Sequence, residues 1–490
     1  MSGSIMLQGS MSDVGKSFLA AALCRIFKED GYSPAPFKSQ NMALNSYVTS
    51  DGLEIGRAQA LQAQAAGLEP SVYMNPILLK PSSDIGSQVI VNGEVFGDMR
   101  AKEYFKYKQK LVPEIKKAYR KLSAEHDMIV IEGAGSPAEL NLKKDDIVNM
   151  GLAKMLKAPV LLIGDIDRGG VFAQLLGTLS LLEEDERKLV KGLIVNRFRG
   201  DIRLFEDGKK IIEERSKLPV IGVVPHIECE LEAEDSLSSK LLKRQSAGDI
   251  DIAAVRLPRI SNFTDLDALM KYNGVSVRFV SSSYELGTPD LIIIPGTKST
   301  ISDMKWLRSC GLAERIISAA YEGIPVFGIC GGYQMMGKKI EDPFCTEGGG
   351  STEGLGLLEC ETVFEQSKTR KRISGKLCGD IKGEFSCLSG AGFYGYEIHM
   401  GKTEVYGSRL FEGGGSFRDN CAGCYIHGFF DSSDISGRFI RHLFEKKGIS
   451  FDENVFDMDE YREMQLDILS RETRKALDME RIYRIIKEGI

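Results

Sequence analysis

The feature that most constrains the fold is a series of short apolar runs, rich in Val, Ile and Leu and bounded by Gly or Pro. Helix-prone stretches separate many of them. The runs lie at residues 4–7, 128–133, 158–164, 192–198 and 219–225, and again at 251–258, 290–296, 324–330 and 424–430. Short runs of this composition suit strands buried on both faces of a sheet, and their alternation with helices is typical of parallel sheets. The sequence therefore predicts an α/β protein built from doubly wound parallel sheets.

The apolar runs form two series, which predict two domains. Residues 232–249 are polar and lie between the series, so we place a domain boundary there. A chain of 490 residues is long enough for two domains of this kind. We expect residues 1–240 to form the first domain, residues 250–440 to form the second, and residues 441–490 to form a helical C-terminal tail.

Composition restricts the class of partner and the compartment. The net charge is −6, whereas proteins that bind nucleic acids usually carry a basic field. No apolar stretch approaches the roughly 20 residues of a membrane helix, and the first residues lack the basic and apolar regions of a signal peptide. Ten cysteines in so long a chain do not form a disulfide scaffold. We expect a cytoplasmic protein with no nucleic-acid or membrane partner. For Cys421 and Cys424, a lone C-x-x-C, we favour buried thiols over a metal or redox pair.

A glycine-rich turn near the N-terminus predicts a phosphate-binding loop. Gly9 is followed by five residues and then by Gly15, Lys16 and Ser17, between a predicted strand and an alanine-rich helix. The standard P-loop has four residues between its glycines. Backbone N–H groups at a helix start can hold phosphates, Lys16 can reach the β- and γ-phosphate oxygens, and Ser17 can hold Mg²⁺. The alternative is a capping turn with a surface lysine.

Polar residues at the ends of other predicted strands fall at the edge where open α/β sheets bind ligands. Glu132 can complete the surroundings of a Mg²⁺ ion, and Asn196 and Arg197 can contact a purine base. Asp165 and Asp167 end another strand, and for them a helix-capping role and a binding role remain equally open. These residues extend the predicted ATP site beyond the loop.

Cys330 occupies a second glycine-rich bend, between the apolar run 324–329 and the pair Gly331 and Gly332. A strand, a nucleophile and a helix in this order form a nucleophile elbow, and a helix N-terminus favours the reactive thiolate. The N–H of Gly331 and that of Gly296, which follows another predicted strand, are candidate oxyanion donors. His427 ends a predicted strand and is the candidate general base. The alternative for Cys330 is a buried thiol.

Both halves resemble known families. The five-residue loop, "EGAG" at 132–135 and "VNR" at 195–197 resemble the dethiobiotin synthetase-like ATPases, which use ATP to activate a carboxylate. The cysteine half resembles the class I glutamine amidotransferases. With "FKSQNMALNS" at 37–46 and "DIDRGGVFAQ" at 165–174, residues 3 to about 440 resemble the cobyric acid synthases of cobalamin biosynthesis.

This resemblance implies ATP- and glutamine-dependent amidation of the b, d, e and g carboxylates of adenosylcobyrinic acid a,c-diamide, with Mg²⁺ and ATP at the first domain. It implies that Asn41 and Asn45 contact the corrinoid. Most class I enzymes carry His-x-Glu, but residues 427–429 are His-Gly-Phe, a departure that cobyrinate amidotransferases share. The third member of the Cys–His site therefore stays open. For His399 we favour a substrate or structural role over catalysis. The alternatives are an a,c-diamide synthase, which typically has an acidic pair in place of "SQNMALN", and a non-catalytic nucleotide-binding regulator.

Overall fold

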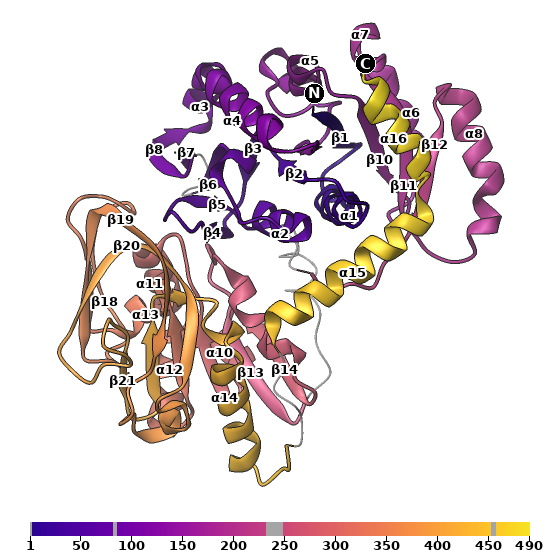
Figure 1. Cartoon of the computed structure of the whole chain (residues 1–490). Coiled ribbons are helices and arrows are strands. Elements are labelled where there is room, and N and C mark those ends of the chain that lie inside the picture. The colour runs from indigo at the N-terminus through magenta and orange to yellow at the C-terminus, as the bar shows by residue number, and fades with distance from the viewer. Residues whose placement is uncertain (1, 82–85, 232–247, 452–456) are drawn as a thin grey trace. The chain divides into compact units, whose positions relative to one another are not determined.

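The computed structural model describes residues 2–81, 86–231, 248–451 and 457–490, which form two compact units. The first unit contains Met1–Ala43, Glu54–Asp235 and Arg462–Ile490, and the second contains Leu44–Leu53 and Ser236–Tyr461. Most of the polar stretch 232–249, where we predict the domain boundary, lies outside the described residues. Each unit is an α/β structure around its own parallel sheet, as the sequence predicts (Figure 1).

The first unit is built on a six-stranded parallel sheet in the order β12-β11-β10-β1-β9-β2. Its strands are β1 (Gly3–Gly9), β2 (Pro34–Phe37), β9 (Met128–Glu132), β10 (Val160–Asp165), β11 (Val190–Phe198) and β12 (Val220–Pro225). Its main helices are α1 (Lys16–Glu29), α2 (Arg57–Ala66), α4 (Val112–Glu125), α5 (Met150–Leu156), α6 (Val171–Leu181) and α8 (Glu206–Ser216). The central strand β1 is apolar and almost wholly buried, which is the pattern expected of a strand covered on both faces.

A smaller four-stranded sheet, which we did not predict, adds to this unit in the order β3-β6-β7-β8. Its strands are β3 (Gln40–Met42), β6 (Ile77–Pro81), β7 (Gly86–Val91) and β8 (Glu94–Arg100), followed by helix α3 (Ala101–Tyr107). Strands β6, β7 and β8 are antiparallel, whereas β3 pairs with β6 in parallel. This sheet places Asn41 in a paired strand.

The C-terminal segment is helical, as predicted, and consists of α15 (Met458–Ala476) and α16 (Met479–Glu488). Residues 462–490 belong to the first unit, where apolar side chains of both helices join the core around β1 and α1. Arg474 bonds Glu29 and Asp30 at the end of α1. After α15, the N–H of Asp478 donates to the carbonyl of Ile221 on β12 (2.8 Å). The tail therefore covers the edge of the main sheet, where unpaired backbone groups would otherwise be exposed.

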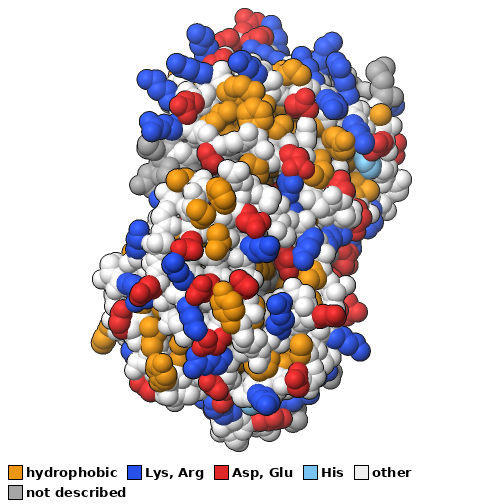
Figure 2. Space-filling view, turned by 90° about the vertical axis from the view of Figure 1, so that its left-hand side faces the viewer, with side chains coloured by type: hydrophobic (Ala, Val, Ile, Leu, Met, Phe, Trp, Pro, Cys, Tyr) orange, Lys and Arg blue, Asp and Glu red, His pale blue; other side chains and the backbone are white. Residues whose placement is uncertain are grey.

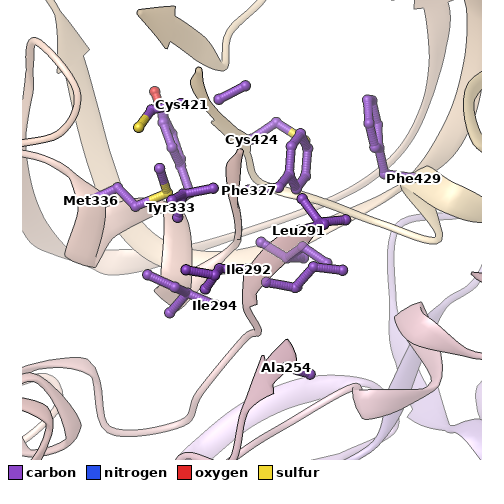
Figure 3. Close-up of a cluster of buried hydrophobic side chains, with 14 of the residues drawn as sticks. Ala254, Leu291, Ile292, Ile294, Phe327, Tyr333, Met336, Cys421, Cys424 and Phe429 are labelled. Atoms are coloured by element: carbon purple, nitrogen blue, oxygen red, sulfur yellow. The ribbon is translucent and has the colours of Figure 1, made fainter. Parts of the chain in front are cut away.

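The second unit has a six-stranded sheet in the order β14-β13-β15-β16-β22-β21, parallel except for the edge strand β21. Its strands are β13 (Ile250–Val255), β14 (Val275–Val280), β15 (Leu291–Ile294), β16 (Val326–Ile329), β22 (Cys421–Cys424) and β21 (Ser416–Arg418). Its helices include α10 (Ser283–Leu286), α11 (Thr300–Ser309), α12 (Leu312–Tyr321), α13 (Gly331–Met336) and α14 (Ser433–Lys446). Figure 3 shows apolar side chains of β15 and β16 packed together with Tyr333 and Phe429.

A second sheet of this unit contains a long antiparallel pair that we did not predict. Its order is β18-β17-β19-β20-β23, with β17 (Lys339–Asp342), β18 (Gly350–Glu353), β19 (Cys360–Lys376), β20 (Gly392–Val405) and β23 (Ile426–His427). The apolar run at 424–430, expected as one strand, is divided at Tyr425. Cys424 ends β22 in the parallel sheet, and His427 ends β23 in the antiparallel one.

The chain carries free thiols and a surface of mixed charge. All ten cysteines are free, and burial raises the pKa of Cys421 to about 12 and that of Cys424 further. On the face shown in Figure 2, acidic and basic side chains lie interspersed over most of the surface. Within the described residues, no helix combines the length and apolar character needed to cross a bilayer.

Candidate functional site

Cys330 lies at a sharp bend between β16 and α13. Its backbone has φ 50° and ψ −107°, a region that a residue with a side chain rarely adopts and that costs on the order of 1–3 kcal/mol. The following glycines allow close packing at the bend: a Cβ on Gly332 would lie 1.9 Å from the carbonyl oxygen of Ile294, and one on Gly331 would lie 3.0 Å from the N of Thr297. The strained bend is the geometry expected of a nucleophile elbow.

His427 lies next to Cys330 and is held by an acid that the sequence did not reveal. Its Nδ1 is 2.7 Å from Oδ2 of Asp265, and Oδ1 of Asp265 accepts the N–H of Gly428 at 2.8 Å. His427 and Asp265 are both almost wholly buried. Burial opposes the charged imidazolium, but the Asp265 carboxylate and the contact with Cys330 outweigh it and raise the pKa of His427 to about 10.

Asp265 was missed because no spacing connects it with His427, which lies 162 residues further along the chain. It belongs to the 3-10 helix η5 (Phe263–Leu266), in the loop that follows β13. The one available signal was its position after a strand, since the carboxyl ends of parallel strands share an edge of the sheet. Asp267 shares that signal, so the sequence alone could not choose between them.

Gly296 and Gly331, the two glycines predicted to donate to the oxyanion, lie close to each other and to His427. A Cβ on Gly296 would lie 3.1 Å from Cε1 of His427, and a Cβ on Gly331 would lie 2.7 Å from Cγ2 of Thr297, the residue after Gly296. The structure thus brings Cys330, Gly331, Gly296 and His427 together in the second unit.

Strand β20 passes beside the thiol. Sγ of Cys330 lies 3.7 Å from the carbonyl oxygen of Ile398. The neighbouring His399 stacks on the ring of Tyr425, with centroids 3.6 Å apart, and its Nδ1 bonds the carbonyl oxygen of Gly401. These contacts occupy both the face and one nitrogen of the ring, so a non-catalytic role for His399 stays our prediction.

In the first unit, the predicted phosphate loop connects β1 to α1. Gly15 precedes α1 with φ 90°, and Asp13 has φ 55°, so the turn depends on left-handed conformations. Nζ of Lys16 donates to the carbonyl oxygens of Met11 and Gly135, each at 3.2 Å. A Cβ on Gly9 would lie 2.8 Å from that Nζ. The lysine therefore folds back over its own loop, toward the loop that follows β9.

Ser17 and Glu132 lie together at the end of β9. Oγ of Ser17 donates to Oε1 of Glu132 at 2.8 Å. Two residues that we did not predict also contact this carboxylate: Nζ of Lys38 at 3.0 Å and Nε2 of Gln62 at 2.6 Å. Burial opposes ionisation of Glu132, but Lys38 and the two hydrogen bonds outweigh it and lower the pKa of the carboxyl group.

The residues predicted to contact a purine lie beside the same loop. Nδ2 of Asn196 donates to the carbonyl oxygen of Val14 at 2.7 Å, so the amide braces the loop. Arg197 bonds Asp165 at 3.0 Å and Asp13 at 2.9 Å. Asp165 also accepts the N–H of Asp167 at 2.8 Å. Asp165 thus pairs with Arg197 and braces the loop after β10, whereas α6 is preceded by Gly170 and has no side-chain cap.

The two asparagines predicted to contact substrate belong to different units. Nδ2 of Asn41 donates to Oε1 of Gln59 at 2.9 Å in the first unit. Asn45 lies in Leu44–Leu53, which groups with the second unit. Oδ1 of this buried side chain has no hydrogen-bond partner among the described residues. The sequence prediction for these positions stays a prediction.

The fold and the two sites define a class: a glutamine amidotransferase domain joined to a nucleotide-binding domain. Residues 251–435 match the family model of the CobB/CobQ-like glutamine amidotransferase domain, and residues 5–238 match that of the CobQ/CobB/MinD/ParA nucleotide binding domain. The chain belongs to the cobyric acid synthase family.

Curated members of that family align over almost the whole chain. The cobyric acid synthase of Lachnoclostridium phytofermentans is 52% identical over 520 residues, covering 100% of both proteins. That of Ruminiclostridium cellulolyticum is 52% identical over 507 residues, covering 100% of this chain and 98% of the relative. That of Caldanaerobacter subterraneus subsp. tengcongensis is 47% identical over 499 residues, covering 99% of this chain and 98% of the relative.

Proposed function

We propose that the protein uses ATP and glutamine to amidate the b, d, e and g carboxylates of adenosylcobyrinic acid a,c-diamide, giving cobyric acid. The observation that carries this proposal is the strained Cys330 bend beside the buried His427–Asp265 pair, which supplies a glutaminase centre. The loop carrying Lys16 and Ser17 supports the ATP-dependent half. We assign the ATP-dependent half to residues 1–240 and the glutaminase to residues 250–440.

In the proposed glutaminase reaction, His427 takes the proton of the Cys330 thiol, and the thiolate attacks the carboxamide carbon of glutamine. The N–H groups of Gly296 and Gly331 stabilise the oxyanion. His427 then gives its proton to the departing nitrogen, so ammonia leaves and a thioester remains. Water, deprotonated by His427, hydrolyses the thioester to glutamate and regenerates the thiol. Asp265 holds the imidazole in the required orientation throughout.

In the proposed synthetase reaction, a corrinoid carboxylate oxygen attacks the γ-phosphorus of ATP and ADP leaves. Ammonia then displaces phosphate from the acyl phosphate, forming the amide. Lys16 neutralises charge on the transferred group. Oγ of Ser17 and Oε1 of Glu132 are hard oxygen donors 2.8 Å apart, a pair that suits Mg²⁺, which would neutralise phosphate charge. Asn196 and Arg197 remain our candidates for contacts with the nucleotide.

The main alternative is a cobyrinic acid a,c-diamide synthase. The neutral stretch 39–45 favours the a,c-diamide as substrate over cobyrinic acid itself. Uncharged amide side chains can pair with the two amides that the diamide already carries, and they do not repel its remaining carboxylates. Mass spectrometry of the product formed from ATP, glutamine and the a,c-diamide tests the assignment: four added amides support it, and no amide added to the diamide contradicts it.

The asparagines of this stretch should affect corrinoid binding. We expect Asn41→Asp and Asn45→Asp each to raise the KM for the corrinoid about tenfold or more, because each places a carboxylate against a polyanionic substrate. The KM values for ATP and glutamine should stay within about twofold of wild type. Steady-state kinetics with each substrate varied in turn makes the measurement, and an unchanged corrinoid KM in both variants would reject the assignment.

Asp265→Asn should reduce glutaminase activity and change its pH dependence. The Asp265 carboxylate raises the pKa of His427, so its loss should lower that pKa from about 10. The protonated imidazole that pairs with the thiolate would then be lost at lower pH, and the alkaline limb of kcat/KM should move to lower pH. We expect kcat to fall on the order of 10²–10⁴-fold because the imidazole loses its orienting acid.

The measurement is the pH profile of glutamine hydrolysis between about pH 6 and 10.5. Asp267→Asn is the matched control, since Asp267 is equally buried and lies two residues further along the same loop. A wild-type profile in Asp265→Asn, or the same shift in both variants, would show that Asp265 does not orient His427.

A further inference from the structure

A ten-residue segment of the second unit comes from the sequence of the first. Leu44–Leu53 lies between two parts of the first unit in sequence, yet it groups with the second. It contains strand β4 (Ser46–Val48), and Ser46, Val48 and Thr49 are fully buried. The packing of Val48 against Tyr396 and Ile398 agrees with the grouping of the segment with the second unit.

Ser46 bonds two residues of this unit through its backbone. Its N–H donates to Oδ1 of Asn262 at 3.0 Å, and its carbonyl oxygen accepts the hydroxyl of Tyr396 at 2.9 Å. Both groups are buried, so each would lose a hydrogen bond at a site with little access to water if the segment moved. Ser46 therefore fixes the positions of Asn262 and Tyr396.

Asn262 contacts Asp265, the acid of the proposed glutaminase centre. It precedes η5 in a left-handed conformation, φ 49°, and its carbonyl oxygen accepts the N–H of Asp265 at 3.0 Å. Asp265 in turn holds Nδ1 of His427. A shift of Asn262 would therefore move the carboxylate that orients the imidazole.

Tyr396 lies next to His427 on the neighbouring strand. It pairs with His427 between β20 and β23, and the centroids of the two rings lie 5.4 Å apart. Val48 of the segment packs with Tyr396 and Ile398, and the carbonyl oxygen of Ile398 lies 3.7 Å from Sγ of Cys330. Through this strand the segment contacts the surroundings of both the base and the nucleophile.

We propose that Ser46 completes the glutaminase centre, with Asn262 and Tyr396 as positioning residues that set the orientation of Asp265 and His427. The inference rests on the proposed function and deepens it. Asn45, a candidate corrinoid contact in the same segment, immediately precedes Ser46 in the chain. Corrinoid binding at Asn45 would therefore act on the glutaminase centre through Ser46, so any stimulation of glutamine hydrolysis by the acceptor should depend on Asn262 and Tyr396.

The test compares Tyr396→Phe and Asn262→Gly with wild type. Phenylalanine removes only the hydroxyl, and glycine removes the side-chain acceptor without strain at φ 49°. Glutamine hydrolysis is measured alone and with saturating ATP and a,c-diamide, together with its pH profile and with synthesis from ammonium chloride. We expect kcat for hydrolysis to fall about tenfold or more, because small misplacements of catalytic groups are costly in rate. The KM for glutamine should change little.

The pH profile, and the stimulation of hydrolysis by ATP and corrinoid, distinguish a positioning role from a general effect on stability. In both variants the alkaline limb should shift to lower pH, stimulation by ATP and corrinoid should be lost, and ammonium-dependent synthesis should remain. Tyr394→Phe is the matched control, because it removes a hydroxyl on the same strand that bonds Asp431 rather than Ser46; it should behave as wild type.

Wild-type kcat, pH profile and stimulation in both variants would overturn the inference. Equal loss of glutamine- and ammonium-dependent synthesis with a lowered Tm would also overturn it, since the contacts would then be merely structural. Cys330→Ala provides the separate check on the proposed function. If that variant still hydrolysed glutamine, the glutaminase assignment itself would fail, whatever the positioning variants did.

Discussion

Cys330→Ala is expected to abolish glutamine-dependent synthesis and to leave synthesis from ammonium salts intact. The thiol is the only group in the proposed reaction that forms the thioester, so without it no ammonia is released from glutamine. The first unit would still form its acyl phosphate, and free ammonia at high pH could displace the phosphate. His427→Ala should behave similarly, because loss of a general base costs on the order of 10²–10⁴-fold in rate.

The measurement is amide formation with glutamine and, separately, with ammonium chloride, alongside glutamate release. Cys421→Ala is the matched control, since Cys421 is also a buried thiol of the second unit but lies at the start of β22. It should keep glutamine-dependent synthesis. A folded Cys330→Ala protein that had lost ammonium-dependent synthesis as well would show that the two reactions do not occur at separate sites.

Lys16→Ala is expected to abolish synthesis from both nitrogen sources. Lys16 is the positively charged side chain of the phosphate loop, and its Nζ lies between the loops that follow β1 and β9. Without that charge, the transferred phosphoryl group loses stabilisation, and we expect synthesis to fall by about 10²–10³-fold or more. Glutamine hydrolysis in the absence of corrinoid should persist, because Cys330 and His427 belong to the other unit.

Two assays decide this prediction: ATP affinity by calorimetry and amide formation with glutamine or ammonium. Lys28→Ala, at the exposed last turn of the same helix, is the matched control and should retain both. Wild-type ATP affinity together with wild-type synthesis in Lys16→Ala would reject the loop as the site of phosphoryl transfer.

Several parts of the fold and the candidate site could be predicted because their signals are local. The parallel strands follow from apolar runs, and the loop before α1 and the bend at Cys330 follow from glycines next to a strand and a helix. Ser17 was predicted from the glycine-rich turn that follows β1, and Glu132 from its place at the end of a strand; the structure brings their side-chain oxygens within 2.8 Å. Strand ends meet at one edge of a parallel sheet, which is why this prediction was possible.

The long pair β19–β20 and the division of the run 424–430 could not be predicted in the same way. Strand β19 is largely polar and exposed, so it lacks the apolar pattern of the buried strands. Tyr425 lies between two short strands that join different sheets, and no local preference marks that change. The pairing of a strand depends on its neighbours in space, which the local sequence does not specify.

The sequence by itself determined the class of each unit and supplied the candidate nucleophile, the candidate base and the candidate phosphate loop, because glycine spacing and apolar periodicity act over a few residues. Only the tertiary structure decided which acid bonds the imidazole of His427, which side chains surround Glu132, and which unit includes Leu44–Leu53. Asp265 and His427 are 162 residues apart, and Lys38 and Glu132 are 94 apart. Buried charges need partners, but any of many Asp or Lys residues could meet that need. Chain topology selects the one that lies within hydrogen-bond distance.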